Sequence, residues 1–123
     1  MKKIMALIPN YNGMKFIKET ILSFKEGMPN VDVIVVDDCS TDDPNSYLDH
    51  LPIKAIYKKN NGGYASAVNK GLKFFLENNY DYVIVANSDI LINKNKAHEI
   101  YNCLVSNFIK DKSDILGFLE NKF

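Results

Sequence analysis

Short continuous runs of apolar residues alternate along the chain with longer stretches in which apolar residues recur at helical spacing. The continuous runs predict strands because turn-forming residues bound each of them. The run at Val31–Val36 is β-branched apart from Asp32, which is typical of a strand buried on both faces of a parallel sheet. The predicted strands are Ile4–Ile8, Val31–Val36, Ile53–Tyr57 and a run that begins at Tyr80 and breaks at Asn87.

The stretches with helical spacing lie between and after these runs. The first begins at Met14 and should end where Gly27 and Pro29 interrupt it. A short helical segment follows around Tyr47–Leu51, and an amphipathic stripe spans Lys94–Lys112. The apolar positions that define the three longer helices are Met14, Ile17, Ile21 and Phe24, then Ala65, Val68, Leu72 and Phe75, and finally Ala97, Ile100, Tyr101, Leu104 and Phe108.

Strictly alternating strands and helices predict an α/β fold with a mostly parallel sheet and helices on both faces. We expect the strand order 3-2-1-4 and a single domain over residues 1–123. Ligands of such sheets bind outside the carboxyl ends of the strands. Polar clusters at 10–12, 37–40, 60–63 and 87–89 each follow a predicted strand. These clusters should therefore converge at one edge of the sheet.

Composition narrows the classes of partner. The 15 basic and 15 acidic residues cancel, so the charge does not indicate a nucleic-acid backbone or an anionic membrane surface as partner. Two cysteines, Cys39 and Cys103, suit a reducing compartment. No apolar run approaches the length of a membrane span. We expect a cytoplasmic protein, which partners could also hold at the inner membrane face.

Several common catalytic signatures are missing from the sequence. There is no G-x-x-x-x-G-K-[ST] phosphate loop, and no G-x-G-x-x-G follows the first strand. His50 and His98 lie far apart and near no polar cluster, which favours surface positions. Cys39 has no nearby histidine to activate it, so a small buried thiol is the better interpretation.

Four motifs, in this order and at these spacings, resemble the nucleotide-binding half of family 2 glycosyltransferases. They are "IPNYNG", "VIVVDDCSTDD", "NNGGYASAVNKGL" and "YDYVIVANSDILI". The resemblance covers roughly residues 3–93. It implies the GT-A fold and inverting transfer from a nucleotide sugar. Each motif is weak alone, whereas four in sequence are specific.

The resemblance implies a nucleobase site at the first two motifs, which contribute Pro9, Tyr11, Asn12, Asp37 and Asp38. Asp38 would accept a hydrogen bond from the imide N–H of uracil or thymine, because a carboxylate only accepts. Cytosine lacks that proton. Asp37 would fix the loop, with turn stabilisation and ligand contact both left open. Tyr11 would offer a ring face to the base, or else would pack on the strand edge.

The third motif carries Gly62, Gly63 and Asn69. Glycines let a backbone approach a ligand closely, and a diphosphate is favoured near the following helix N-terminus. A plain loop before a helix is the alternative. The resemblance implies that Asn69 helps to hold the loops together.

The fourth motif places Asn87, Ser88 and Asp89 where the family carries its D-x-D metal site. Mn²⁺ or Mg²⁺ bridging a diphosphate takes oxygen ligands and often only one or two protein carboxylates, and Asp89 fits that role. Asn87 replaces the first acid, as in rhamnosyltransferase-like members. It can hydrogen-bond ribose or phosphate, but it brings no charge. An Asx turn that closes the strand is the alternative interpretation.

The resemblance also implies an acceptor half that carries the catalytic base. No residue after Asp89 matches the family's base motif, and none of Asp111, Asp114 and Glu120 is assigned that role. The catalytic base is therefore unknown.

Three interpretations of function remain open. The chain is a glycosyltransferase that is naturally short or continues in an acceptor half outside this sequence. It is, alternatively, a nucleotide-sugar-binding module without transfer activity that needs a partner. The third possibility is an interaction protein. The acceptor implied by the resemblance is a glycan or a lipid-linked glycan in polysaccharide biosynthesis.

The end of the sequence is unusually apolar. The segment "ILGFLENKF" contains Ile115, Leu116, Phe118, Leu119 and Phe123. Apolar segments of this kind cover exposed sheet edges or partner surfaces. We therefore predict a homo-oligomer that associates through this C-terminal region.

Overall fold

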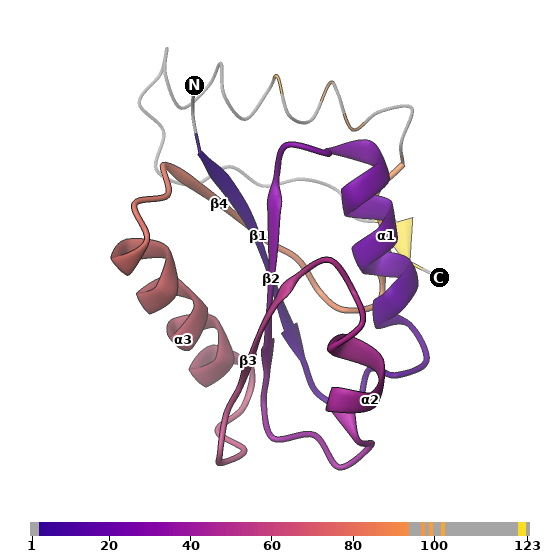
Figure 1. Cartoon of the computed structure of the whole chain (residues 1–123), viewed down its shortest axis with the longest axis vertical. Helices are drawn as coiled ribbons and strands as arrows, with labels where there is room; N and C mark the ends of the chain where they lie inside the picture. Colours follow the sequence, from indigo (N-terminus) through magenta and orange to yellow (C-terminus); the bar gives the residue numbers. More distant parts are fainter. Residues whose placement is uncertain (1–2, 94–96, 98, 100–101, 103–120, 123) are drawn as a thin grey trace.

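The computed structural model describes residues 3–93, together with residues 97, 99, 102 and 121–122. Its centre is a four-stranded sheet in the order β3-β2-β1-β4, in which every neighbouring pair is parallel. The predicted α/β class and strand order are confirmed (Figure 1). The strands are β1 (Ile4–Asn10), β2 (Asp32–Asp37), β3 (Lys54–Tyr57) and β4 (Tyr82–Val85).

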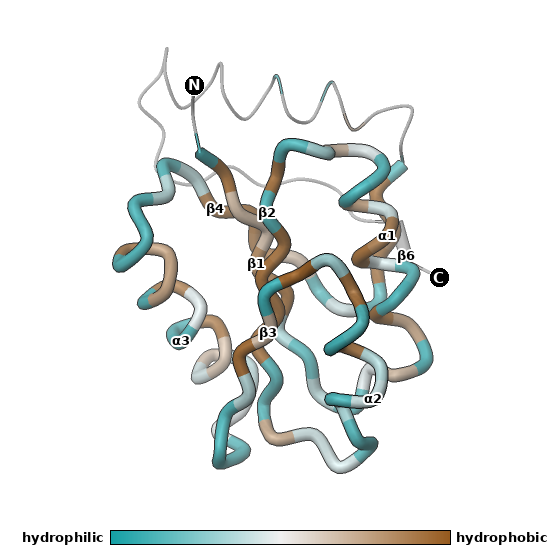
Figure 2. The backbone as a smooth tube through the Cα atoms, in the orientation of Figure 1, coloured by the Kyte–Doolittle hydropathy of each residue, from teal (hydrophilic) through white to brown (hydrophobic). Residues whose placement is uncertain are grey.

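Helices cover both faces of this sheet. α1 (Ile17–Gly27) and α2 (Pro44–Leu48) lie on one face, and α3 (Tyr64–Glu77) lies on the other (Figure 1). The most apolar part of the backbone is the middle of the sheet (Figure 2). All seven residues of β1 are buried, because it has a strand on each side and a helix layer on each face. A continuous apolar strand is the expected sequence for that position.

α3 approaches β1 at unusually close range through a glycine. A Cβ atom added to Gly71 would lie 2.2 Å from Cδ1 of Leu7. Both residues are buried, so the missing side chain allows the helix to sit directly on the central strand. This contact places the N-terminus of α3 at the carboxyl edge of the sheet.

α1 begins at Ile17, three residues after the predicted start at Met14. The Gly13 carbonyl accepts the N–H groups of Phe16 and Ile17 at 3.0 and 2.9 Å, which makes a turn before the helix. The N–H of Met14 donates to the Asp42 carboxylate at 3.1 Å, and the Met14 side chain is 50% exposed. The helix start is therefore set by a contact with another loop rather than by apolar spacing.

β1 runs two residues further than the predicted Ile4–Ile8 and includes Pro9 and Asn10. Pairing with β4 ends at Leu7, whereas pairing with β2 continues to Asn10. The Leu7 carbonyl accepts the Ala86 N–H on the β4 side of the strand. Pro9 lies two residues later and faces the same side, where pairing with β4 has ended, so its lack of an N–H leaves no strand hydrogen bond unmade. A proline is tolerated at such a position.

Two short strands, β5 (Ile90–Leu91) and β6 (Asn121–Lys122), form an antiparallel pair that the sequence pattern did not predict. Of the predicted last helix, the structure describes only Ala97, Glu99 and Asn102, which are helical. The rest of that helix, the acids at 111, 114 and 120, and the apolar residues from 115 to 119 and at 123 lie outside the described residues. Within the described part, no helix combines the length and the apolar character that a membrane crossing requires.

Candidate functional site

The four predicted polar clusters meet at the carboxyl edge of the sheet, as expected. They line a cleft of about 620 Å³. That volume lies within the range of roughly 300–1,000 Å³ that is typical of small-molecule sites. The residues around the cleft are Pro9, Asn10, Tyr11, Asn12, Gly13, Phe16, Asp38, Asn61, Gly63, Tyr64, Ala67, Asn87, Ser88 and Asp89.

Asp38 lies at the wall of this cleft with only 4% of its surface exposed. Its Oδ1 accepts hydrogen bonds from the Lys58 ammonium group and from the Gly62 N–H at 3.0 Å. Its Oδ2 accepts the N–H of Gly63 at 2.8 Å. Burial acts to raise the pKa of Asp38, but these hydrogen bonds and the adjacent charge outweigh it and hold the pKa below the ordinary value of 3.8. The carboxylate is therefore ionised and aligned.

Asp37 has a different environment from its neighbour. It is 1% exposed and does not line the cleft. Its Oδ1 accepts from the Asn10 amide at 2.8 Å and from the Ser40 hydroxyl at 2.6 Å, and its Oδ2 accepts the Ser40 N–H at 2.9 Å. Asp37 thus holds the loop that follows β2 against the end of β1, which is the loop-fixing role expected for it.

Further contacts join the loop after β1 to the loop after β2. The Asn12 N–H donates to the Ser40 hydroxyl at 2.8 Å, and the Thr41 N–H donates back to the Asn12 side chain at 2.8 Å. The Tyr47 hydroxyl donates to Asp42 at 2.7 Å. Burial and this bond raise the pKa of Tyr47 above its ordinary value. The first two loops consequently form one rigid wall of the cleft.

Two tyrosine rings line the cleft and are largely exposed to it. Tyr11 is 51% exposed and Tyr64 is 58% exposed. A ring at this exposure is not packed into the core and leaves a face open to the cleft. Exposed aromatic faces beside an ionised carboxylate are suited to binding a flat polar ring.

Gly63 precedes α3 with a φ of +91°, a conformation that favours glycine. This geometry turns the N–H groups of Gly62 and Gly63 toward Asp38. Gly62 itself lies outside the cleft lining. The two glycines therefore act on the site by fixing Asp38, and their N–H groups are already engaged.

Asn87, Ser88 and Asp89 form the far wall, and Asp89 is exposed. The hydroxyl of Thr20 on α1 lies 2.8 Å from the Ser88 carbonyl and 2.6 Å from the Ile90 carbonyl, so it holds this segment in place. The described residues contain no group of three or more His, Cys, Asp or Glu side chains that could hold a metal ion by themselves. One exposed carboxylate beside amide and hydroxyl oxygens fits a Mg²⁺ or Mn²⁺ ion whose other ligands come from a diphosphate.

Asn69 lies on an exposed part of α3 and outside the cleft. The hydrogen bonds that join the described loops involve other side chains. Its role in nucleotide binding stays a prediction.

Sequence reasoning missed the parts that Lys58, Tyr64 and Asn10 take in the site. Lys58 directly follows β3, and a charged residue at the end of a parallel strand was a signal that could have identified it. Tyr64 opens α3 beside the glycines, where an aromatic residue at a helix N-terminus was a weaker signal. Asn10 lies in the predicted polar cluster at 10–12, but the sequence assigned it no role, because its contact with Asp37 joins two distant segments.

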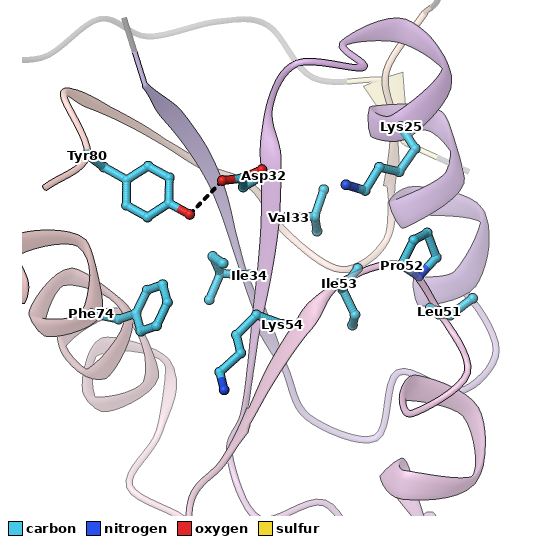
Figure 3. A pocket seen from close by; sticks show the side chains of 10 residues that line it. All are labelled: Lys25, Asp32, Val33, Ile34, Leu51, Pro52, Ile53, Lys54, Phe74 and Tyr80. Atoms are coloured by element: carbon cyan, nitrogen blue, oxygen red, sulfur yellow. Dashed lines mark hydrogen bonds between the residues drawn. The ribbon is translucent and has the colours of Figure 1, made fainter. Parts of the chain in front are cut away.

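A second hollow, of about 400 Å³, lies at the opposite, amino ends of β2 and β3 (Figure 3). Its charged residues include Lys25, Lys54 and Asp32, and the Tyr80 hydroxyl donates to Asp32 at 2.7 Å. Burial and this bond raise the pKa of Tyr80 to about 12. None of the four polar clusters reaches this hollow.

Comparison with known proteins supports the resemblance. Residues 5–108 match Glycosyl transferase family 2. The glycosyltransferase GlyG of Streptococcus pneumoniae is 27% identical over 120 residues, which cover 93% of this chain and 38% of GlyG. The poly(ribitol-phosphate) β-N-acetylglucosaminyltransferase TarS of Staphylococcus aureus is 34% identical over 102 residues, which cover 76% of this chain and 17% of TarS.

Solved structures give the same result for the fold. The structure of TarS 1-349 in complex with UDP superposes with a TM-score of 0.68 at 28% identity, covering 91% of this chain and 33% of that chain. A mannosyltransferase from Pyrobaculum calidifontis, in complex with GDP-Man and Mn²⁺, shares the fold with a TM-score of 0.58 at 22% identity, covering 72% of this chain and 28% of that chain. The chain thus spans well under half the length of these relatives. It belongs to glycosyltransferase family 2 and carries its GT-A fold.

Proposed function

We propose that this chain binds a UDP- or dTDP-linked sugar with a divalent metal and supplies the donor side of an inverting glycosyl transfer. The observation that carries the proposal is the buried, ionised and aligned Asp38 at the wall of the cleft. The UDP complex of TarS supports the choice of nucleotide. The substitution at Asn87 favours a rhamnosyltransferase-like member of the family.

The nucleobase is recognised at the first wall of the cleft. Asp38 accepts the imide N–H of uracil or thymine, and the exposed ring of Tyr11 stacks on the base. Pro9 and Asn12 line the same wall. The contacts of Asp37 with Asn10 and Ser40 keep this wall in position without ligand.

The ribose and diphosphate extend toward the loop after β4. Asn87 and Ser88 offer uncharged hydrogen-bonding groups, and Asp89 offers the carboxylate for Mn²⁺ or Mg²⁺. A bound divalent ion would offset the negative charge that develops on the departing diphosphate. Because Asn87 brings no charge, metal binding should depend strongly on the nucleotide.

In the transfer, an acceptor hydroxyl attacks the anomeric carbon of the sugar, and the bond from that carbon to the diphosphate oxygen breaks. The hydroxyl proton passes to a base, and the nucleoside diphosphate leaves. The described residues supply donor binding, whereas the base is still to be identified. A glycan or lipid-linked glycan in polysaccharide biosynthesis is the proposed acceptor. Among the relatives, TarS is named as a transferase that acts on poly(ribitol-phosphate).

Calorimetric titration tests the donor site. We expect UDP and dTDP to bind, CDP to bind more weakly, and Mn²⁺ to tighten UDP binding. Asp89→Ala should remove the increment due to Mn²⁺ and preserve metal-free binding of UDP. Asp43→Asn is the control that removes a carboxylate elsewhere, because Asp43 is exposed, lies outside the cleft and has a positive φ that Asn tolerates. Absence of UDP binding with and without Mn²⁺ would refute the proposed function.

A separate assay tests catalysis. The chain is incubated with a panel of UDP- and dTDP-sugars, with and without acceptor glycans, and the products are identified by mass spectrometry. Release of the nucleoside diphosphate, with the sugar transferred to an acceptor, is expected of a glycosyltransferase. Binding of the donor without any turnover would instead favour a binding module that needs a partner.

A further inference from the structure

We propose that Lys58 determines which nucleobase Asp38 accepts, by occupying Oδ1 and leaving a single acceptor position on Oδ2. The inference rests on the proposed nucleotide site. It adds a residue that does not line the cleft and that acts through Asp38. Lys58 is therefore a positioning residue, and it affects which nucleobase binds.

The position of the Lys58 ammonium group is closely defined. It donates to Oδ1 of Asp38 and, at 2.6 Å, to the hydroxyl of Ser66 on α3. Only 12% of the Lys58 side chain is exposed. A Cβ added to Gly62 would lie 2.9 Å from the ammonium nitrogen, so the group is enclosed beneath that glycine. The ion pair is therefore a fixed part of the site.

The acceptor capacity of Asp38 can be counted. A carboxylate has about four lone-pair positions, two on each oxygen. Oδ1 receives two donors, from Lys58 and Gly62, and Oδ2 receives one, from Gly63. One position remains, and it is on Oδ2. Asp38 can thus accept one further hydrogen bond.

Nucleobases differ in the number of donors they present to such a carboxylate. Uracil, thymine and hypoxanthine present one ring N–H. Guanine presents a ring N–H and an adjacent amino group, a parallel pair that needs both oxygens. With Oδ1 filled, the amino group of guanine would be left without an acceptor in a desolvated site, which is unfavourable. The geometry therefore selects a base with a single donor.

Inosine and guanosine diphosphates separate this effect from base size, since they are purines that differ only in the amino group. The wild-type chain should bind UDP, and it should bind IDP about tenfold or more tightly than GDP. In Lys58→Met the second position on Oδ1 is free, so we expect the ratio of IDP to GDP affinity to fall toward one and GDP to gain about tenfold relative to UDP.

Two further variants complete the experiment. Lys59→Met is the matched control, because Lys59 is exposed and its side chain does not touch Asp38, and it should leave every ratio unchanged. Lys58→Arg retains a cationic donor and should restore the preference for IDP. Circular dichroism establishes that each variant is folded. If Lys58→Met does not fold, the wild-type IDP-to-GDP ratio and the Lys58→Arg variant decide the question.

Several outcomes would overturn the proposal. The first is equal affinity of the wild-type chain for IDP and GDP, and the second is an IDP-to-GDP affinity ratio in Lys58→Met that equals the wild-type ratio. The third is binding of UDP, but of neither purine nucleotide, by both the wild type and Lys58→Met. That result would show that the size of the cleft selects the base. Failure to bind UDP as well would refute the proposed function itself. The two failures are therefore distinguishable.

Discussion

Two adjacent aspartates with opposite roles illustrate how single residues define this site. Asp37 faces Asn10 and Ser40 behind the cleft, whereas Asp38 faces the cleft wall and the glycines before α3. Successive side chains of an extended segment point in opposite directions. Neither carboxylate is solvated, so each is buried together with its own set of donors.

The change Asp38→Asn tests the residue in the cleft. The amide can turn its oxygen toward the base, but it loses a charge-assisted hydrogen bond, so binding of UDP or dTDP should weaken by about 1 kcal/mol or more. Asp43→Asn, at an exposed position with a positive φ that Asn tolerates, should bind normally. An unchanged dissociation constant in folded Asp38→Asn would exclude Asp38 from the site.

Asp38 should also make the free energy of unfolding depend on pH in the acid range. Because the pKa of Asp38 is lowered on folding, its stabilising contribution is present above the ordinary value of 3.8 and is lost as pH falls through the folded pKa. The difference in unfolding free energy between wild type and Asp38→Asn should therefore shrink below about pH 4. Urea unfolding at pH 6 and pH 3 measures it. A difference that grows toward acid would contradict the assignment.

At the scale of elements, α1 links the core to the loop after β4. Its inner face is fully buried, and from that face Thr20 reaches the carbonyls of Ser88 and Ile90. The Ser23 hydroxyl accepts the Ile92 N–H at 3.0 Å on the same helix. A helix on one face of the sheet thus positions the segment that carries Asp89.

Thr20→Val keeps the shape of the side chain and removes the hydroxyl. Buried carbonyls would lose a donor, which should cost about 1–3 kcal/mol of stability. The loosened segment should also reduce the tightening of UDP binding by Mn²⁺, with little effect on UDP alone. Thr20→Ser retains the hydroxyl and is the control. Denaturant unfolding and calorimetry measure the two effects, and equal Mn²⁺ dependence in both variants would contradict this role.

Gly71→Val tests the close contact between α3 and β1. A side chain there must displace Leu7 in a filled core, so we expect a loss of about 1–3 kcal/mol in the free energy of unfolding. Lys73→Val makes a comparable change at an exposed position of the same helix and should cost much less. Leu7→Ala combined with Gly71→Val should be less destabilising than the sum of the single changes. Additive losses would show that the two side chains do not compete for space.

At the scale of the whole molecule, the described sheet ends at β3 on one side and β4 on the other. Val85 on β4 is 39% exposed. An exposed apolar strand at a sheet edge is a site for pairing with another segment. The longer relatives contain much more chain than the part that matches here. We therefore predict that the edge at β4 pairs with further structure or with a second copy of the chain.

Self-association through the C-terminal region is the corresponding prediction. Light scattering at tens of micromolar should show dimers or larger species for residues 1–123. A version that ends at Lys112 should show fewer of them or lower solubility, because the apolar segment is removed. A strict monomer in both cases, with equal solubility, would contradict the prediction.

The alternation of apolar runs and helical stripes was sufficient to predict the α/β class, the strand order and the meeting of four polar clusters. The sequence predicts these features because a strand buried on both faces must be continuously apolar, as Val33–Val36 is. Parallel strands in addition bring their carboxyl ends to one edge of the sheet. The motifs also indicated Asp38 and Asp89, and both residues line the cleft. The spacing of apolar residues within a few positions is enough to distinguish a buried strand from an amphipathic helix.

Only the tertiary structure decided how the site is held together. Lys58 lies 20 residues from Asp38, and the Asp42 side chain that holds the N–H of Met14 lies 28 residues away from it, so no local pattern reports either contact. Packing between segments likewise determines where α1 starts and that the glycine N–H groups bond to Asp38. It also determines that Asn69 is exposed. Hydrogen bonds between distant segments form only after the sheet brings strand ends together, and for that physical reason the sequence alone did not determine them.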